Sequence, residues 1–99
     1  MSVIFIIHFD VKKEKQNVFS NMMCSVKTEL PLVEGCVEVN IFQNIAQPQR
    51  YTLVEKWETK KLHEQHVSHL IKTGMWDQIS ALIEKEPHSD YFDIFKNSL

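Results

Sequence analysis

The alternation of apolar and polar residues along the chain predicts four β-strands. Residues 2–9 carry β-branched and aromatic side chains on both alternating faces, which is typical of a strand that is covered on both sides. Three further segments alternate with a period of two residues: Cys36 to Gln43, Arg50 to Glu58 and His88 to Lys96. A short polar connection, residues 44–49, joins the second and third strands, and we expect these two to form a hairpin.

Two other segments have the apolar spacing of amphipathic helices. The first covers residues 12–29 and is closed by Pro31. The second begins after Thr59, a residue type that is favoured at helix N-caps. Its inward stripe is predicted to hold Leu62, His66, His69 and Leu70, with His63 at the margin. Gly74 is expected to break or bend this helix, and the helical pattern then resumes and continues to Pro87.

The element order β-α-β-β-α-β predicts an α+β fold, a ferredoxin-like antiparallel sheet with both helices on one face. Residues 1–99 are long enough for one such domain and too few for a second. The face of the sheet away from the helices still carries apolar side chains from the first strand and needs a cover. We therefore expect a homodimer in which two sheets face each other, a dimeric α+β barrel.

Charge and composition argue against several classes of partner. The chain has 11 basic and 13 acidic residues, and the basic residues are scattered, so we expect no nucleic acid partner. The longest apolar run, Val3 to Ile7, is too short to span a membrane and has no features of a signal peptide. We expect a cytoplasmic protein without membrane contact.

Residues 51–69, YTLVEKWETKKLHEQHVSH, join an alternating strand that contains Glu55-x-Trp57 to a helix that carries His66. A carboxylate, an indole and an imidazole are thereby expected within reach of one cavity. The segment resembles the signature of the antibiotic biosynthesis monooxygenase family, a (F/Y)-x-(L/V)-x-E-x-W strand followed by a helix with a histidine. The resemblance extends over nearly the whole chain and includes two shorter matches, at Glu34-Gly35-Cys36 and at Phe42-Gln43-Asn44.

The resemblance implies oxygenation of a small aromatic, quinol or anthrone-type substrate by dioxygen without a cofactor. Such a reaction needs a dry cavity, a base and hydrogen-bond donors for a developing oxyanion. His66 is expected to act as the base, and Trp57 to supply a flat wall and an N–H donor. Asn44 and Tyr51 are expected to hold a substrate oxygen, and Glu55 to orient His66 or an arginine. The remaining substrate-binding candidates are His69 and Trp76.

Each candidate also has a structural interpretation. Trp57 and His66 are equally consistent with core side chains. A carboxylate at position 55 that faces inward requires a partner, and a salt bridge to Arg50 or to a lysine across the dimer would satisfy it. Asn44 at a strand end is consistent with a turn cap.

The reaction has alternatives as well. One is a non-enzymatic dimeric module, either a small-ligand-binding barrel or a stress-related barrel, and another is an isomerase of the same superfamily. A phosphorylated isomerase substrate is disfavoured, because no arginine other than Arg50 is present to grip an anion. His63, His66 and His69 spread around the helix and cannot all face one ion, so no metal site is expected.

Overall fold

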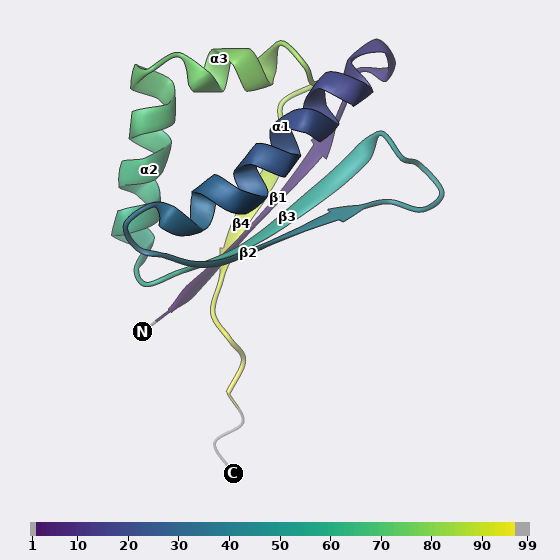
Figure 1. The fold of residues 1–99 in the computed structure, drawn as a ribbon. Coiled ribbons are helices and arrows are strands. Elements are labelled where there is room, and N and C mark those ends of the chain that lie inside the picture. Colours follow the sequence, from purple (N-terminus) through teal and green to yellow (C-terminus); the bar gives the residue numbers. More distant parts are fainter. Residues whose placement is uncertain (1, 97–99) are drawn as a thin grey trace.

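A computed structural model describes residues 2–96, which form a four-stranded antiparallel sheet with the helices packed on one face (Figure 1). The strands, in the spatial order β2-β3-β1-β4, are β1 (Val3–Asp10), β2 (Cys36–Gln43), β3 (Arg50–Trp57) and β4 (His88–Phe92). The helices are α1 (Gln16–Glu29), α2 (Lys60–Lys72) and α3 (Met75–Ser80), and short 3-10 turns flank α1 at Lys13–Lys15 and Leu30–Leu32. The expected α+β ferredoxin-like fold is confirmed.

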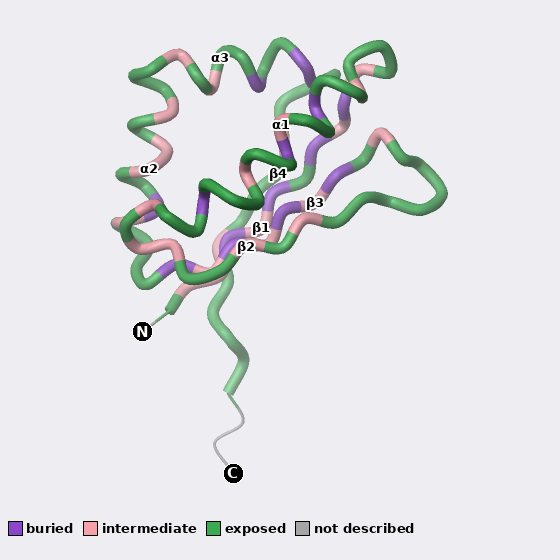
Figure 2. The backbone as a smooth tube through the Cα atoms, in the orientation of Figure 1, coloured by how far each residue is buried: buried purple, intermediate pink, exposed green. Residues whose placement is uncertain are grey.

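The core lies between the sheet and the helices and is built on alternate residues of β1 and β3. The pairing of these strands aligns Phe5 with Glu55 and Ile7 with Leu53, so that their side chains share the face towards the helices. Figure 2 shows the buried positions concentrated on these two central strands. The buried apolar residues are Phe5, Ile7, Phe9, Val11, Phe19, Met23, Leu30, Tyr51, Leu53, Trp57, Ile79, Leu82 and Ile83.

The opposite face of the sheet also carries apolar side chains, and no helix of residues 2–96 packs on it. Across the strands of this face, Ile6 pairs with Val54 and Ile4 with Phe92. Phe92 is 46% exposed, and Phe42 near the end of β2 is 56% exposed. Large apolar side chains gathered on one exposed face are typical of an interaction surface.

α3 is shorter than predicted. The helical pattern was expected to continue to Pro87, whereas α3 ends at Ser80. The segment that follows leaves the helical path because it pairs with the end of β1. The Glu84 N–H donates a hydrogen bond to the carbonyl of Asp10 at 2.7 Å. The backbone of this segment therefore forms its hydrogen bonds with the end of β1, although the spacing of its apolar residues is typical of a helix.

β4 is shorter than predicted as well, since it ends at Phe92 rather than at Lys96. Phe92 pairs with Ile4, which lies close to the start of β1. Only Val3 of β1 lies beyond Ile4, so a strand continued past Asp93 would have no partner residue in β1. The alternating pattern of residues 93–96 is therefore not sufficient to continue the strand within this chain.

Both ends of α2 agree with the sequence. The Thr59 hydroxyl oxygen accepts a hydrogen bond from the Leu62 N–H at 3.1 Å, which makes Thr59 the N-cap. Gly74 has φ +82° and separates α2 from α3, which meet at a corner in Figure 1. Neither α2 nor any other helix described within residues 2–96 has the length and apolar character needed to cross a membrane.

Replacing Gly35 with alanine is expected to lower the free energy of unfolding by about 2–4 kcal/mol. Gly35 has φ +90°, and a Cβ atom there would lie 2.7 Å from the Cβ of Leu62. Gly74→Ala is the matched control: its φ is similar, but nothing lies within 4 Å of its added Cβ atom. We expect that control to lose only about 1–2 kcal/mol. Urea denaturation measures both, and equal losses would show that the contact with α2 is unimportant.

Candidate functional site

A cavity of about 590 Å³ lies between the sheet and the helices. Most of its wall is apolar, with contributions from β1, β3, α1, α2 and α3. Five titratable side chains interrupt this wall, namely Glu29, Glu55, His63, His66 and Glu86. The apolar residues that line it include Phe5, Ile7, Met22, Met23, Val26, Leu30, Leu53, Val67, Leu70, Met75, Trp76 and Ile79. A concave apolar site with a few polar groups is the usual form of a small-molecule site.

Glu55 is a carboxylic acid in the core of the protein, where 6% of the residue is exposed. Trp57 lies two residues further along β3 on the same face, and its indole N–H donates a hydrogen bond to Glu55 Oε1 at 2.9 Å. Burial raises the pKa of Glu55 from 4.5 to about 7, and the Trp57 hydrogen bond opposes this increase. The group therefore changes its protonation state close to neutral pH.

His63 of α2 lies against Glu55 and is 2% exposed. Its Nε2 atom is 3.8 Å from Glu55 Oε1, and its Nδ1 atom is 2.6 Å from the hydroxyl oxygen of Tyr91 in β4. Burial, followed by the nearby charge of His66, lowers the pKa of His63 from 6.5 to about 4. The imidazole is consequently neutral at pH 7, so its contact with Glu55 is not an ion pair at that pH.

His66 follows His63 by three residues and also lines the cavity. Its ring centroid lies 5.3 Å from that of Trp57. Burial lowers the pKa of His66, and the charge of His69 acts in the same direction. A second imidazole, neutral at pH 7, therefore lines the same cavity as the carboxyl group of Glu55.

Three of the predicted residues meet at this cavity, namely Glu55, His66 and Trp76. Trp57 takes a different place from the one expected. It is fully buried and its N–H is used by Glu55, so it does not present a donor to the cavity. Trp57 is thus a core side chain whose N–H is bonded to Glu55, and its expected role as a substrate donor stays a prediction.

The predicted inward stripe of α2 is wrong at His69, which is exposed. The buried histidine of this helix is His63, which had been placed at the margin. The helix is therefore rotated relative to the expectation, because His63, Val67 and Leu70 at positions i, i+4 and i+7 face the sheet. That spacing was visible in the sequence and identifies His63 as an inward residue.

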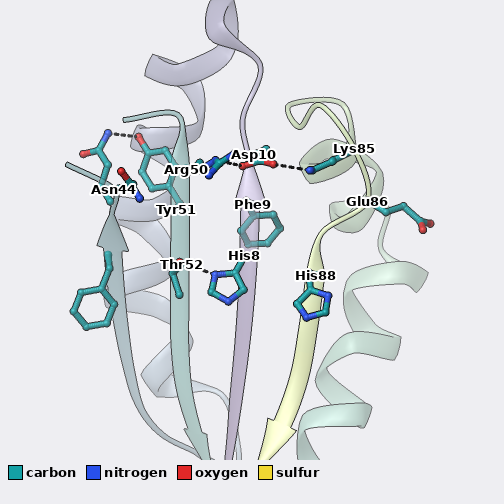
Figure 3. A pocket seen from close by; sticks show the side chains of 12 residues that line it. His8, Phe9, Asp10, Asn44, Arg50, Tyr51, Thr52, Lys85, Glu86 and His88 are labelled. Atoms are coloured by element: carbon teal, nitrogen blue, oxygen red, sulfur yellow. Dashed lines mark hydrogen bonds and ion pairs between the residues drawn. The ribbon is translucent and has the colours of Figure 1, made fainter. Parts of the chain in front are cut away.

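Asn44 and Tyr51 do not reach the cavity beside Glu55. They border a second hollow of about 600 Å³ at the other end of the sheet (Figure 3). The Asn44 side-chain oxygen accepts a hydrogen bond from the Gln47 N–H at 2.8 Å, which confirms its interpretation as a turn cap. The Tyr51 hydroxyl oxygen accepts a hydrogen bond from the Gln43 amide at 3.2 Å. Neither residue lines the cavity beside Glu55, and the expectation that they hold a substrate oxygen stays a prediction.

The expected salt bridge between Glu55 and Arg50 is also absent from the described residues. Strand register places Arg50 opposite Asp10, five residues away from Glu55. Figure 3 shows Asp10 between two cations, with Arg50 Nε at 3.2 Å and Lys85 Nζ at 3.1 Å from its carboxylate oxygens. Glu55 thus has an indole and a neutral imidazole as neighbours in place of a cation.

Comparison with known proteins places these features in a family. Among solved structures, a conserved protein from Methanosarcina mazei is 23% identical over 93% of this chain and 91% of that chain, with a TM-score of 0.81. Rv0793 from Mycobacterium tuberculosis is 11% identical, covers 100% of both chains and has a TM-score of 0.83. A variant of SnoaB, a cofactor-independent oxygenase from Streptomyces nogalater, is 12% identical over 98% of this chain and 96% of that chain, with a TM-score of 0.80.

At these low sequence identities, the TM-scores show a common fold. No curated protein matches the chain. The family model for antibiotic biosynthesis monooxygenases matches residues 2–73, which include β1 to α2 and the Glu55, His63 and His66 side chains. The chain belongs to the antibiotic biosynthesis monooxygenase family.

Proposed function

We propose that this protein is a cofactor-independent monooxygenase that oxidises a small aromatic substrate of the quinol or anthrone type in the cavity beside Glu55. The observation that carries the proposal is a buried carboxylic acid, poised near neutral pH, in the wall of an apolar cavity. Family membership and the shared fold with SnoaB support the reaction class. Electrons for the reduction of dioxygen come from the substrate.

Glu55 is the proposed base. A general base works best when its pKa lies near the working pH, and the pKa of Glu55, about 7, meets this condition. The lowered pKa of His66 makes its imidazole a weaker proton acceptor than the carboxylate. His66 is better suited to donate its N–H to the oxygen on which negative charge develops.

The proposed reaction of an anthrone starts at its CH₂ carbon. Glu55 takes one proton from the CH₂ carbon, and the resulting enolate oxygen accepts a hydrogen bond from His66. The carbon then bonds to one oxygen atom of O₂, and Glu55 returns the proton to the other. Loss of the second hydrogen of that carbon breaks the O–O bond, so that CH₂ and O₂ become C=O and H₂O. Exclusion of water from the apolar cavity protects the enolate during these steps.

The charge of the cavity favours an uncharged substrate. Its acidic lining residues are Glu29, Glu55 and Glu86, and no lysine or arginine of residues 2–96 lines it. A phosphorylated or carboxylated ligand would have no cation to bind it and would meet these carboxyl groups. The same observation disfavours an isomerase of a phosphorylated substrate.

Oxygen uptake with a panel of anthrones and hydroquinones tests the proposal. We expect His66→Ala to reduce kcat by about 100-fold, the usual cost of removing one oxyanion donor. His69→Ala is the matched control, because His69 lies one turn along α2 and is exposed. Its rate should equal that of the unchanged protein. Equal rates for both variants would remove His66 from the mechanism.

A second candidate function is binding of a small apolar ligand without a reaction. The observation that favours it is the presence of Met22, Met23 and Met75 in the cavity wall, because methionine adapts to ligands of several shapes. Saturable binding of an anthrone without oxygen uptake, in a protein with its native fold, would support this function over oxygenation.

We also propose a homodimer formed through the open face of the sheet. Ile6 is at the centre of that face, where it pairs with Val54. Ile6→Asp places an unpaired charge within the proposed interface and is expected to convert the dimer to a monomer. Ile45→Asp is the matched control, because Ile45 is 99% exposed in the β2–β3 connection. Light scattering at micromolar concentration measures the mass, and a monomeric unchanged protein would contradict the dimer.

A further inference from the structure

Tyr91 and His63 form a contact with Glu55 that the proposed reaction does not use. The three side chains come from β4, α2 and β3 and meet at one point of the core. Tyr91 Oη lies 2.6 Å from His63 Nδ1, and His63 Nε2 lies 3.8 Å from Glu55 Oε1. A segment of the chain that lies outside the family match thus reaches the base of the proposed site.

The His63 ring is fixed on several sides. The ring centroid of Phe5 lies 3.9 Å from it, and those of Trp57 and Tyr91 lie 5.1 and 5.3 Å away in edge-on arrangements. With 2% of the residue exposed, the imidazole has little space in which to turn. Its two nitrogen atoms therefore keep separate partners, Tyr91 on one side and Glu55 on the other.

The Tyr91 contact determines which nitrogen of His63 carries the proton. A neutral imidazole has one N–H donor and one acceptor nitrogen. A separation of 2.6 Å is typical of a hydroxyl donor and short for an N–H donor. Burial, followed by the charges of Glu64 and Glu55, raises the pKa of Tyr91, so its hydroxyl keeps the proton that it donates. The Tyr91 hydroxyl then donates to Nδ1, and the proton of His63 is on Nε2, facing Glu55.

We propose that His63, held by Tyr91, is the positioning residue for the Glu55 carboxyl group. Its Nε2–H faces Oε1 and favours the ionised form of Glu55, the form that accepts a proton from the substrate. The torsion that turns the carboxyl group is soft, so small rotations bring the oxygen towards Nε2–H. The proposal rests on the proposed function only in treating Glu55 as the base.

Other groups lie around Glu55 on the surrounding elements. His66 of α2 lines the same cavity, and the pKa of Cys36 in β2 is raised by burial and then by the charge of Glu55. Tyr91 of β4 is influenced by Glu55 in the same way. A test must therefore change the Tyr91 and His63 contacts while leaving Cys36 and His66 in place.

The Trp57 indole N–H reports the ionisation of Glu55 directly, because it donates to Glu55 Oε1. Its NMR resonance, followed against pH without any substrate, gives the midpoint of the Glu55 titration. Tyr91→Phe removes the hydroxyl that keeps the His63 proton on Nε2, and His63→Phe removes the N–H itself. Both substitutions are expected to raise this midpoint by about one pH unit. His63→Gln keeps an N–H donor and should restore part of the difference. Tyr51→Phe is the control, because Tyr51 is a buried tyrosine bonded to Gln43 instead.

The ¹⁵N spectrum of His63 at neutral pH provides an independent readout. A protonated Nε2 and an unprotonated Nδ1 support the proposal, and the opposite tautomer overturns it. An unchanged or lowered midpoint in Tyr91→Phe also overturns it, as does a shift of equal size in Tyr51→Phe. None of these results depends on turnover, so absence of oxygen uptake would contradict the proposed function without changing the outcome here.

Discussion

Glu55→Gln is expected to reduce oxygen-dependent turnover of an anthrone or hydroquinone by about 10²- to 10⁴-fold, the usual contribution of a general base. Glutamine is nearly the same size and still accepts a hydrogen bond from Trp57, but it cannot take a proton. In the unchanged protein, kcat/KM should increase with pH and level off above about pH 7, since burial raises the pKa of Glu55 to about 7. The residual kcat/KM of the variant should not show this increase with pH.

Glu58→Gln is the control for this variant. Glu58 follows β3 directly and is exposed, so its substitution removes a carboxylate of the same strand region without changing the cavity. Oxygen uptake from pH 5 to 9, with circular dichroism to verify the fold, provides the comparison. A folded Glu55→Gln protein with unchanged rates would exclude Glu55 as the base.

The same substitution is expected to change stability in a pH-dependent way. The pKa of Glu55 is raised from 4.5 to about 7, so between these pH values the folded protein holds a proton that the unfolded chain has released. Stability from this group is therefore present below pH 4.5 and is lost as the pH rises through about 7. The loss amounts to about 3 kcal/mol at 1.36 kcal/mol per pKa unit. The free energy of unfolding of Glu55→Gln, measured relative to that of the unchanged protein, should therefore increase by this amount between pH 4.5 and 7.

His63 acts in the opposite direction. Its pKa is lowered from 6.5 to about 4, so the unfolded chain binds a proton that the folded protein excludes. Stability from this group is present above pH 6.5 and is lost as the pH falls through about 4. The contributions of Glu55 and His63 therefore offset each other between about pH 4.5 and 6.5. In His63→Phe, the stability should decrease with rising pH because only the Glu55 contribution remains. In Glu55→Gln, the stability should increase with rising pH because only the His63 contribution remains.

Urea denaturation at half-unit pH steps measures these differences. The comparison is made between each variant and the unchanged protein, so contributions from exposed carboxylates cancel. Glu58→Gln is the control for the loss of an exposed carboxylate from the same strand region. A Glu55→Gln difference that is constant with pH would show that the carboxyl group of Glu55 titrates at the same pH in the folded and unfolded states.

The fold was predictable from the sequence because burial of one side of a strand imposes a period of two. Tyr51, Leu53, Glu55 and Trp57 therefore showed which face of β3 turns inward, and all four are buried. Local chemistry was equally informative at Thr59, where a hydroxyl caps the helix. Such features depend on neighbours in the sequence, and they agree with the structure.

The candidate site was less predictable because it depends on contacts between distant segments. Tyr91 and His63 meet through the packing of α2 on β4, which no local pattern specifies. Asn44 lies near the residues of the family signature in sequence, yet the length of β3 carries it to the far end of the sheet. The sequence allowed Arg50 as a partner for Glu55, but the register between β1 and β3 places Arg50 opposite Asp10, with which it forms an ion pair.

The hydrogen bond between Trp57 and Glu55 joins two residues of one strand, whereas the opposite wall of the cavity consists of helices. A ligand that enters by displacing α2, which carries His63, would leave this bond intact and separate Glu55 from His63. Access of a ligand to the cavity and the basicity of Glu55 would then be linked. While the helix is displaced, the Glu55 carboxyl group would lose its His63 neighbour, but Trp57 would still hold its orientation. When the helices return, both neighbours are in place again before a proton moves. In that case β3 would keep the carboxyl group in place, and the position of α2 would decide whether His63 is its neighbour.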